Sequence, residues 1–300
     1  MRKFITIFLS LVFPVFSSIS VYFTPAERGE KEILEKLKEA KNSVLIASYK
    51  FNHPEIIKIL KNKKLKELKI IVEKGDIPFS KKNIHSYKGR NGIFHSKFIV
   101  IDGKITVVGS GNFTENDFHL FHNNFLIIED REISEFFKRK FLSIWNNKEN
   151  KGIFKKEKIE IYFSPENNVE KKIIEEIKKA KSYIYFACFF LTSENIARAL
   201  IKQKIKGIEE KGIFENYNTS INSLFYILND SGINVRKSNI AGFLHDKLFI
   251  IDGKTVITGS YNPTVSAKKN YETIIILREE KIAKIYRKNW VKFWRWKCLP

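Results

Sequence analysis

The chain has 300 residues, 43% of them hydrophobic and 29% charged, which is enough apolar material for a large core. Its net charge of +21 divides evenly, with 26 basic and 17 acidic residues up to residue 150 (+9) and 28 and 16 after it (+12). This spread excludes a single basic tail, and the two cysteines exclude a disulfide-rich scaffold. A field of this sign attracts polyanions, although a compositional bias toward Lys, Ile, Phe and Asn explains the charge equally well.

The first twenty residues have the order of a secretory signal. Arg2 and Lys3 precede an apolar run over residues 4–16, and small residues follow at 18–20. We therefore expect residues 1–20 to be a signal peptide and the protein to be secreted or periplasmic, or membrane-anchored if the signal is not cleaved. The apolar run is short for a membrane span, which needs about 20 residues.

The chain contains an internal repeat. Residues 21–51 resemble residues 161–191 at an offset of 140, whereas two later motifs repeat at an offset of 150. The second copy therefore has about ten extra residues, which we place within 214–231. The repeat predicts two lobes, over residues 21–150 and 151–300.

Each half predicts the same order of elements: strand, helix, strand, helix, strand, hairpin, strand and helix. In the first half these are 21–23, 31–41, 43–49, a helix from residue 54, 68–72, a hairpin over 95–109, 125–128 and 133–145. In the second half they are 161–163, 171–181, 183–189, a helix from residue 193, 233–235, a hairpin over 245–259, 273–277 and 281–296. This alternation predicts an α/β fold of sheets covered by helices, with a linker over 146–158.

One motif, His-x-Lys-x-x-x-x-Asp followed by Gly-Ser-x-Asn, occurs in both predicted hairpins. The copies are His95, Lys97, Asp102, Gly109, Ser110 and Asn112, and His245, Lys247, Asp252, Gly259, Ser260 and Asn262. Side chains alternate along a strand, so the His and Lys of each copy point the same way. An Asp-Gly turn then returns Ser and Asn beside them. Six such polar residues in duplicate have no packing purpose.

Four motif residues are expected to have structural roles. Asp102 and Asp252 fix the hairpin turns, and Gly109 and Gly259 allow a close approach of the backbone.

The two motifs resemble those of the phospholipase D superfamily, and the resemblance covers nearly all of residues 21–300. It implies two similar α/β/α lobes with mixed sheets, related by a pseudo-two-fold axis, and one active site at their interface. It also implies cleavage of a phosphodiester through a phosphohistidine, with no cofactor and no metal. Endonucleases, phospholipases D, cardiolipin hydrolases and phosphatidyl-transferases share this pattern.

The residue chemistry agrees with that mechanism. Lysine and amide groups can hold phosphate oxygens, and one neutral imidazole can attack phosphorus while the other transfers protons. The residues expected to bind oxygens are Lys97, Lys247, Asn112 and Asn262, with Ser110, Ser260 and Asn124 in support. The resemblance also implies an acidic residue that orients the motif histidine; Glu272 fits this place for His245, and the first half offers only Asn124 there. A carboxylate favours imidazolium, so the hypothesis makes His245 the proton donor and His95 the nucleophile.

Several alternatives remain open at this point. The substrate is nucleic acid or phospholipid. A phosphatidyl-transferase of the cardiolipin synthase type and a non-catalytic nucleic-acid-binding protein are the other readings. Peripheral contact with an anionic membrane is one expectation, and a monomer is another, because one chain has both motifs. Trp290 and Trp294 repeat Phe141 and Trp145, which favours core packing over membrane docking. The remaining histidines are expected at the rim or surface: His53, His85, His119 and His122.

Overall fold

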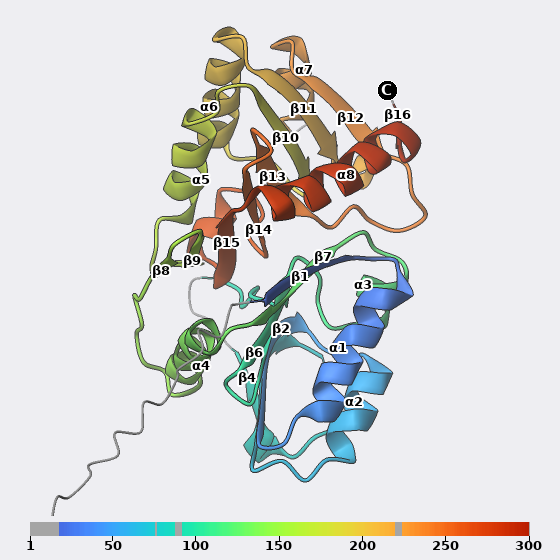
Figure 1. The fold of residues 1–300 in the computed structure, drawn as a ribbon, viewed down its shortest axis with the longest axis vertical. Coiled ribbons are helices and arrows are strands. Elements are labelled where there is room, and N and C mark those ends of the chain that lie inside the picture. The colour runs from blue at the N-terminus through green and yellow to red at the C-terminus, as the bar shows by residue number, and fades with distance from the viewer. Residues whose placement is uncertain (1–17, 76, 88–91, 220–223, 300) are drawn as a thin grey trace, which may run out of the picture.

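The computed structural model describes residues 18–299 apart from 76, 88–91 and 220–223. Within these residues the chain forms two mixed sheets flanked by helices (Figure 1). The first lobe contains β1 (Ser18–Phe23), α1 (Glu27–Glu39), β2 (Ser43–Lys50), α2 (Pro54–Lys61), β3 (Glu67–Lys74), β4 (Ile84–Ser86), β5 (Phe98–Ile101), β6 (Ile105–Gly109), α3 (Glu115–His119), β7 (Asn124–Glu129) and α4 (Arg131–Trp145).

The second lobe repeats this order with additions. Its elements are β8 (Phe154–Lys156), β9 (Ile159–Ser164), α5 (Val169–Lys178), β10 (Tyr183–Cys188), α6 (Glu194–Ile205), β11 (Glu209–Phe214), α7 (Phe225–Asp230), β12 (Asn234–Ser238), β13 (Lys247–Ile251), β14 (Thr255–Gly259), β15 (Glu272–Arg278), α8 (Glu280–Trp296) and β16 (Cys298–Leu299).

The two sheets have the same strand order. The first runs β1-β7-β6-β5-β2-β3-β4, and the second contains β9-β15-β14-β13-β10-β11-β12 with β8 and β16 added at its edges. Among the described strands, β2 pairs with β3 and β3 with β4 in parallel, as do β10 with β11 and β11 with β12. The other strand pairs of the two sheets are antiparallel. The fold prediction of two similar lobes with mixed sheets is confirmed.

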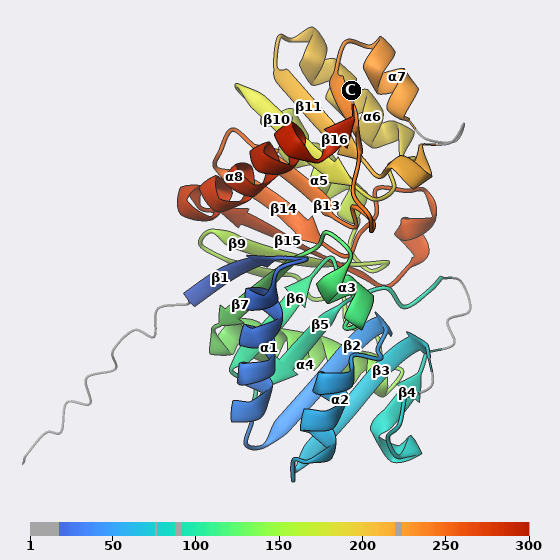
Figure 2. The ribbon, with the colours of Figure 1, turned by 90° about the vertical axis from the view of Figure 1, so that its right-hand side faces the viewer.

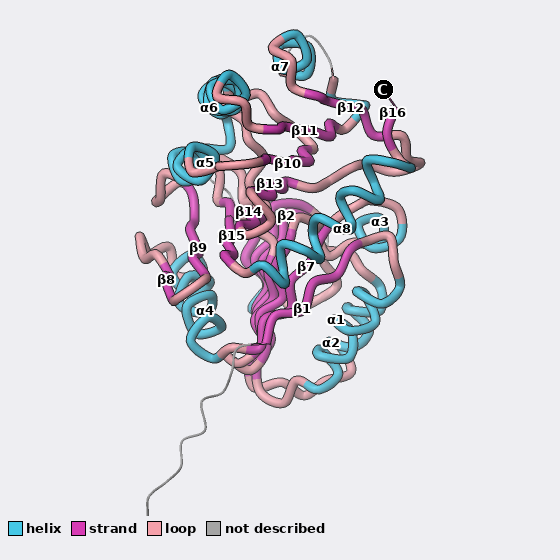
Figure 3. Tube along the Cα trace, turned by 45° about the horizontal axis from the view of Figure 1, so that its top comes forward, coloured by secondary structure: helices cyan, strands magenta, loops and turns pink. Residues whose placement is uncertain are grey.

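The helices form layers on both faces of the sheets. Helices α1 and α2 pack on one face of the first sheet, and α5 and α6 on one face of the second. The inner faces share one apolar cluster with α4 and α8, so the core is continuous between the lobes. Figure 3 shows α4 across the strands from α1 and α2. Trp290 and Trp294 are buried in this shared cluster and Trp296 is exposed, which confirms the expected packing of the first two.

Local signals explain where the helices begin. Asp130 caps α4, Asn168 caps α5 and Ser193 caps α6, each accepting a backbone N–H from three residues further on. Pro54 is the first residue of α2, where its missing N–H costs nothing.

Two element predictions need correction. The strand over 233–235 was matched to 68–72, but β11 is the counterpart of β3, and β12 is the counterpart of β4. The prediction missed β11 because Glu209, Glu210 and Lys211 interrupt its apolar pattern. The expected linker over 146–158 also contributes β8, which pairs with β9.

The extra residues of the second lobe are where they were expected. Nine residues separate β3 from β4 and nineteen separate β11 from β12, a difference of ten. The longer connection contains α7, and residues 220–223 lie outside the described part.

The N-terminal prediction falls mainly on residues 1–17, which lie outside the described residues. Ser18–Phe23 forms β1, an edge strand whose residues 18–20 pair with Ile127, Ile128 and Glu129 of β7. Among the described residues, no helix has both the length and the apolar character that a membrane crossing needs.

Candidate active site between the lobes

The motif hairpins are built by turns that Asp102 and Asp252 stabilise. Both residues have positive φ, 52° and 54°, and each is followed by a glycine of positive φ. The carboxylate of Asp102 accepts the backbone N–H groups of Lys41, Asn42 and Ser43 at 2.7–2.8 Å. Asp252 accepts the equivalent groups in the second lobe. Each carboxylate therefore ties its hairpin turn to the segment that precedes β2 or β10.

Each motif histidine lies just before the first strand of its hairpin and is held by the other lobe. The backbone N–H of His95 donates to the carbonyl of Tyr271 at 2.8 Å, next to β15. The backbone N–H of His245 donates to the carbonyl of His122 at 2.8 Å, next to β7. Each lobe therefore supplies the carbonyl that accepts the backbone N–H of the other lobe's motif histidine.

Because the lobes exchange these contacts, the side-chain partner of His95 also comes from the second lobe. Its Nδ1 lies 2.8 Å from Oε2 of Glu272, a carboxylate with no solvent exposure. The prediction that Glu272 orients His245 is therefore wrong. Burial lowers the pKa of His95, and Glu272 opposes that shift. With Nδ1 bonded to the carboxylate, Nε2 remains for chemistry.

His245 has an amide partner from the first lobe. Its Nδ1 donates to Oδ1 of Asn123 at 2.9 Å, and the Asp117 carboxylate lies 3.5 Å from the same nitrogen. Burial, Lys247 and Lys97 hold the pKa of His245 well below its usual range. The sequence prediction placed Asn124 beside His95, as the first-half counterpart of Glu272. Both parts need correction, because the amide is that of Asn123 and the ring that it contacts is His245.

Both motif lysines are buried beneath the histidines. Nζ of Lys97 donates to the carbonyl of His95, and Nζ of Lys247 to the carbonyl of His245, both at 2.5 Å. Burial lowers the pKa of Lys97 to about 7 and that of Lys247 to about 8. Two ammonium groups without a directly paired carboxylate form a site that favours an added anion.

Both histidines open into one cleft of about 670 Å³ between the lobes. Asn112 and Asn262 also line it, and the Oδ1 atom of each is buried without a hydrogen-bond partner. Aromatic side chains form part of its wall: Tyr49, Phe121, Phe189, Phe190 and Phe243. The predicted pairing of motif His and Asn residues at one interface site is present.

Five residues expected to contact substrate do not line the cleft: the buried Lys97 and Lys247, and Ser110, Ser260 and Asn124. Ser110 donates to Oδ1 of Asn123 at 3.1 Å, and Ser260 donates to Oε2 of Glu272 at 2.6 Å. Asn124 donates to Asp246 and accepts from Thr258. Ser110, Ser260 and Asn124 are fully buried, so each positions another residue. The substrate-binding prediction for them needs correction.

The two motif glycines allow the approach that the sequence predicted. A Cβ on Gly109 would lie 2.1 Å from the carbonyl oxygen of Asn124, and one on Gly259 would lie 2.2 Å from that of Thr273. Gly259 also has φ +139°, which side chains disfavour.

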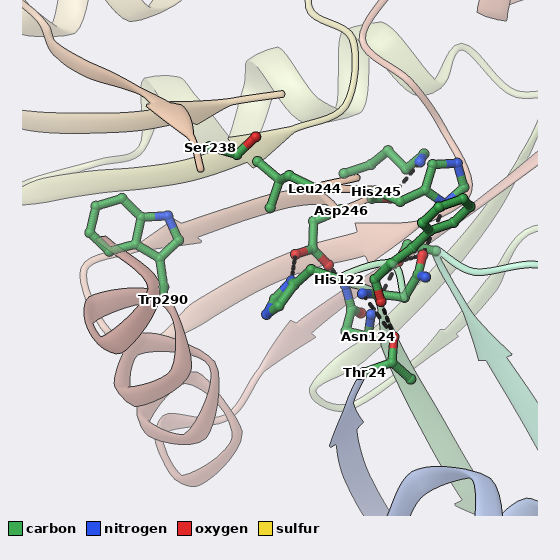
Figure 4. Close-up of polar contacts among 12 residues, drawn as sticks. Thr24, His122, Asn124, Ser238, Leu244, His245, Asp246 and Trp290 are labelled. Carbon is green, nitrogen blue, oxygen red and sulfur yellow. Dashed lines mark hydrogen bonds and ion pairs between the residues drawn. The ribbon is translucent and has the colours of Figure 1, made fainter. Parts of the chain in front are cut away.

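Sequence reasoning missed Asp117 and Asp246. Asp117 accepts the backbone N–H of Asn112 at 3.0 Å and the side-chain amides of Asn112 and Asn123. Asp246 lies between His122 and Asn124, beside His245, as Figure 4 shows. His122 is therefore an interlobe partner of Asp246 and not a rim residue. The Asp that follows His245 in the motif was the available signal.

Comparison with known proteins agrees with the repeat. The family described as "Cardiolipin synthase, PLD-like domain" matches residues 33–145 and 173–294. A phospholipase D of Rickettsia prowazekii is 35% identical over 130 residues, which is 43% of this chain and 63% of that protein. A mitochondrial cardiolipin hydrolase of Xenopus laevis is 30% identical over 125 residues, 41% of this chain and 60% of that protein. The chain thus spans less than two thirds of the length of these relatives.

A solved structure supports the two-lobed fold. The phosphatidylserine synthase of Haemophilus influenzae superposes with a TM-score of 0.72 over 93% of this chain and 87% of that one, at 10% identity. Because the family match covers both halves and includes both motifs, the chain belongs to the phospholipase D superfamily, with one PLD-like domain in each lobe.

Proposed function

We propose that this protein is a metal-independent phosphodiesterase that cleaves its substrate through a covalent phosphohistidine. One observation carries the proposal: two imidazoles from different lobes share one cleft, and Nδ1 of each is bonded to a buried partner. Both Nε2 atoms are then available to a phosphodiester, with the Asn112 and Asn262 side chains in the same cleft. The ammonium groups of Lys97 and Lys247 are buried behind the cleft wall, 5.8 Å from the Tyr49 ring and 5.1 Å from the Phe189 ring.

The reaction balances with these groups alone. Nε2 of one histidine attacks phosphorus, and the P–O bond to the leaving group breaks as the second imidazolium gives that oxygen its Nε2 proton. Water then attacks phosphorus and loses its proton to the second imidazole. The N–P bond breaks, which releases a phosphomonoester and restores both rings. Lys97 and Lys247 stabilise the charge that builds on the non-bridging oxygens.

We assign the nucleophile to His95 and the proton transfer to His245, for a reason that differs from the one the sequence suggested. The attacking ring becomes cationic as the N–P bond forms, and Glu272 stabilises that charge. The hydrogen-bond partner of His245 is a neutral amide, and the Asp117 carboxylate lies farther from the ring, at 3.5 Å, so the His245 imidazolium releases a proton more readily than one bonded directly to a carboxylate. A bound phosphodiester supplies the negative charge that lets His245 hold the proton beforehand.

The relatives' names favour a phospholipid substrate. The proteins matched at 35% and 30% identity are named a phospholipase D and a cardiolipin hydrolase. Nucleic acid is the second candidate, because a net charge of +21 spread over both lobes suits a polyanion.

A parallel assay tests both candidates. Purified protein in EDTA is incubated with phosphatidylcholine vesicles, cardiolipin vesicles, plasmid DNA and RNA, beside His95→Ala and His245→Ala. We expect turnover of one class in the parent and none in either variant. Quenching in alkali, where the N–P bond survives, should place the phosphoryl group, with the ester that it retains, on His95 by peptide mass. The same adduct on His245 would reverse the roles, and binding without turnover of any substrate would contradict the proposal.

A further inference from the structure

Outside the cleft, two histidines and one glutamate converge within the first lobe. They come from three elements: Glu30 from α1, His53 from the N-cap of α2 and His119 from the last position of α3. One ligand atom of each lies within 4.8 Å of the other two. Helix α1 packs against α2 and α3, and Figure 2 shows the three on one side of the first sheet.

The glutamate faces both rings. Oε1 of Glu30 lies 3.0 Å from Nε2 of His53, and Oε2 lies 2.6 Å from Nε2 of His119. None of the three residues lines the cleft between the lobes. His53 and His119 were expected at the surface or rim, and of these two only His119 is exposed.

The ion pair with Glu30 does not fully explain the surroundings of the two ring nitrogens of His53. The residue is 1% exposed, and its Nε2 is buried in ion-pair contact with Glu30 at 3.0 Å but makes no hydrogen bond of regular geometry. A native fold rarely leaves such a nitrogen without a hydrogen bond. Its other nitrogen, Nδ1, accepts the backbone N–H of Ile56 at 3.4 Å, which is long for a hydrogen bond.

We propose that Glu30, His53 and His119 bind a zinc ion. Two imidazole nitrogens and one carboxylate are a ligand set that Zn²⁺ takes in four-coordinate sites whose fourth position holds water. Binding at Nε2 puts the remaining ring proton of His53 on Nδ1, so the long contact in which Nδ1 accepts the Ile56 N–H is given up when the ion binds. The His119 side chain is half exposed, which gives the ion a path from solvent.

The proposed site also connects to the catalytic cleft through α3. This helix contains Asp117, which holds Asn112 and Asn123, and Asn123 holds His245. Zinc would thus fix the helix that orients one active-site ring, without supplying a metal to the reaction.

Zinc titration of the full chain tests the site. Protein stripped with EDTA and desalted is titrated with Zn²⁺ against a chromophoric chelator, and its melting temperature is followed. We expect one zinc per chain with a Kd on the order of 1 µM or tighter, and a rise in Tm with zinc. Mg²⁺, which prefers oxygen ligands, should give neither effect.

Four variants locate the ion. His119→Ala and Glu30→Gln should each weaken zinc binding by about 10- to 100-fold or more. Glu35→Gln, the same exchange at an exposed position of α1, and His95→Ala in the cleft should bind as the parent does. Binding that survives in His119→Ala and Glu30→Gln, binding that is lost in His95→Ala, or no binding at all would overturn the proposal. None of these results depends on which substrate the cleft accepts.

Discussion

Oε2 of Glu272 and Nδ1 of His95 lie 2.8 Å apart although 177 residues separate them in the chain. The equivalent contact in the other direction joins Asn123 to His245. The two hydrogen-bond partners differ in charge, because one is a carboxylate and the other an amide, and the Asp117 carboxylate lies farther from the His245 ring, at 3.5 Å. The duplicated fold therefore gives its two histidines different electrostatic surroundings, and this difference can separate a nucleophile from a proton donor.

Replacing Glu272 by Gln should slow catalysis by on the order of 100-fold or more, with little change in KM. The amide keeps the size of the side chain but removes the charge that stabilises the cationic ring of His95. Single-turnover rates, which isolate formation of the covalent intermediate, are the measurement. Glu280→Gln, the same exchange at an exposed residue after β15, is the matched control. A Glu272→Gln rate within a few-fold of the parent would argue against His95 as the nucleophile.

The motif lysines predict an alkaline limit for kcat/KM. Because the pKa of Lys97 is about 7 and that of Lys247 about 8, the free enzyme loses both positive charges as the pH rises above these values. The parameter kcat/KM reports the free enzyme, so it should fall between pH 7 and 9. Lys97→Arg keeps a charge at every pH and should move this limit upward. A flat profile to pH 9.5 would show that the ammonium groups are not required.

Much of the fold could be predicted because each local sequence pattern occurs twice, once in each half of the repeat. The buried strands β2 and β10, the capped helices and the Asp-Gly turns each follow from local residues. The sequence pattern does not predict β11, because Glu210 is buried at a position where a buried strand is expected to have an apolar residue. Periodicity detects burial only when the buried residue is apolar.

The residues of the site could be predicted from the sequence, but the side-chain partner of each histidine could not. The motif gives the histidines, lysines and asparagines, although His95 and His245 lie just before β5 and β13 and not within a strand. Strand alternation contains no information about which lobe supplies the partner of each ring. Sequence proximity suggested Glu272 for His245, whereas the crossing of the segments before β7 and β15 gives Glu272 to His95.

Glu210 should destabilise the protein at alkaline pH. Burial raises the pKa of its carboxyl to about 8, and neither oxygen has a hydrogen-bond partner. A group whose folded pKa lies above its unfolded value, here 4.5, contributes stability below 4.5 that is lost as pH rises to 8. Glu210→Gln should therefore be more stable than the parent by an amount that grows over this range, to about 1–4 kcal/mol at pH 9. Urea unfolding at pH 5 and 9 measures it, and an equal difference at both pH values would contradict the expectation.

Gly259 should be essential for the position of Glu272. An alanine there has to adopt φ +139° and places its Cβ 2.2 Å from the carbonyl oxygen of Thr273, the residue after Glu272. We expect Gly259→Ala to cost about 1–3 kcal/mol or more in unfolding free energy and to lower kcat by displacing Glu272 from His95. Gly207→Ala is the matched control, because Gly207 has φ +89° but no atom within 4 Å of an added Cβ. It bears the backbone strain without the crowding, so it should lose stability and keep kcat. Equal kcat values for the two variants would show that the backbone approach at Gly259 does not position the catalytic carboxylate.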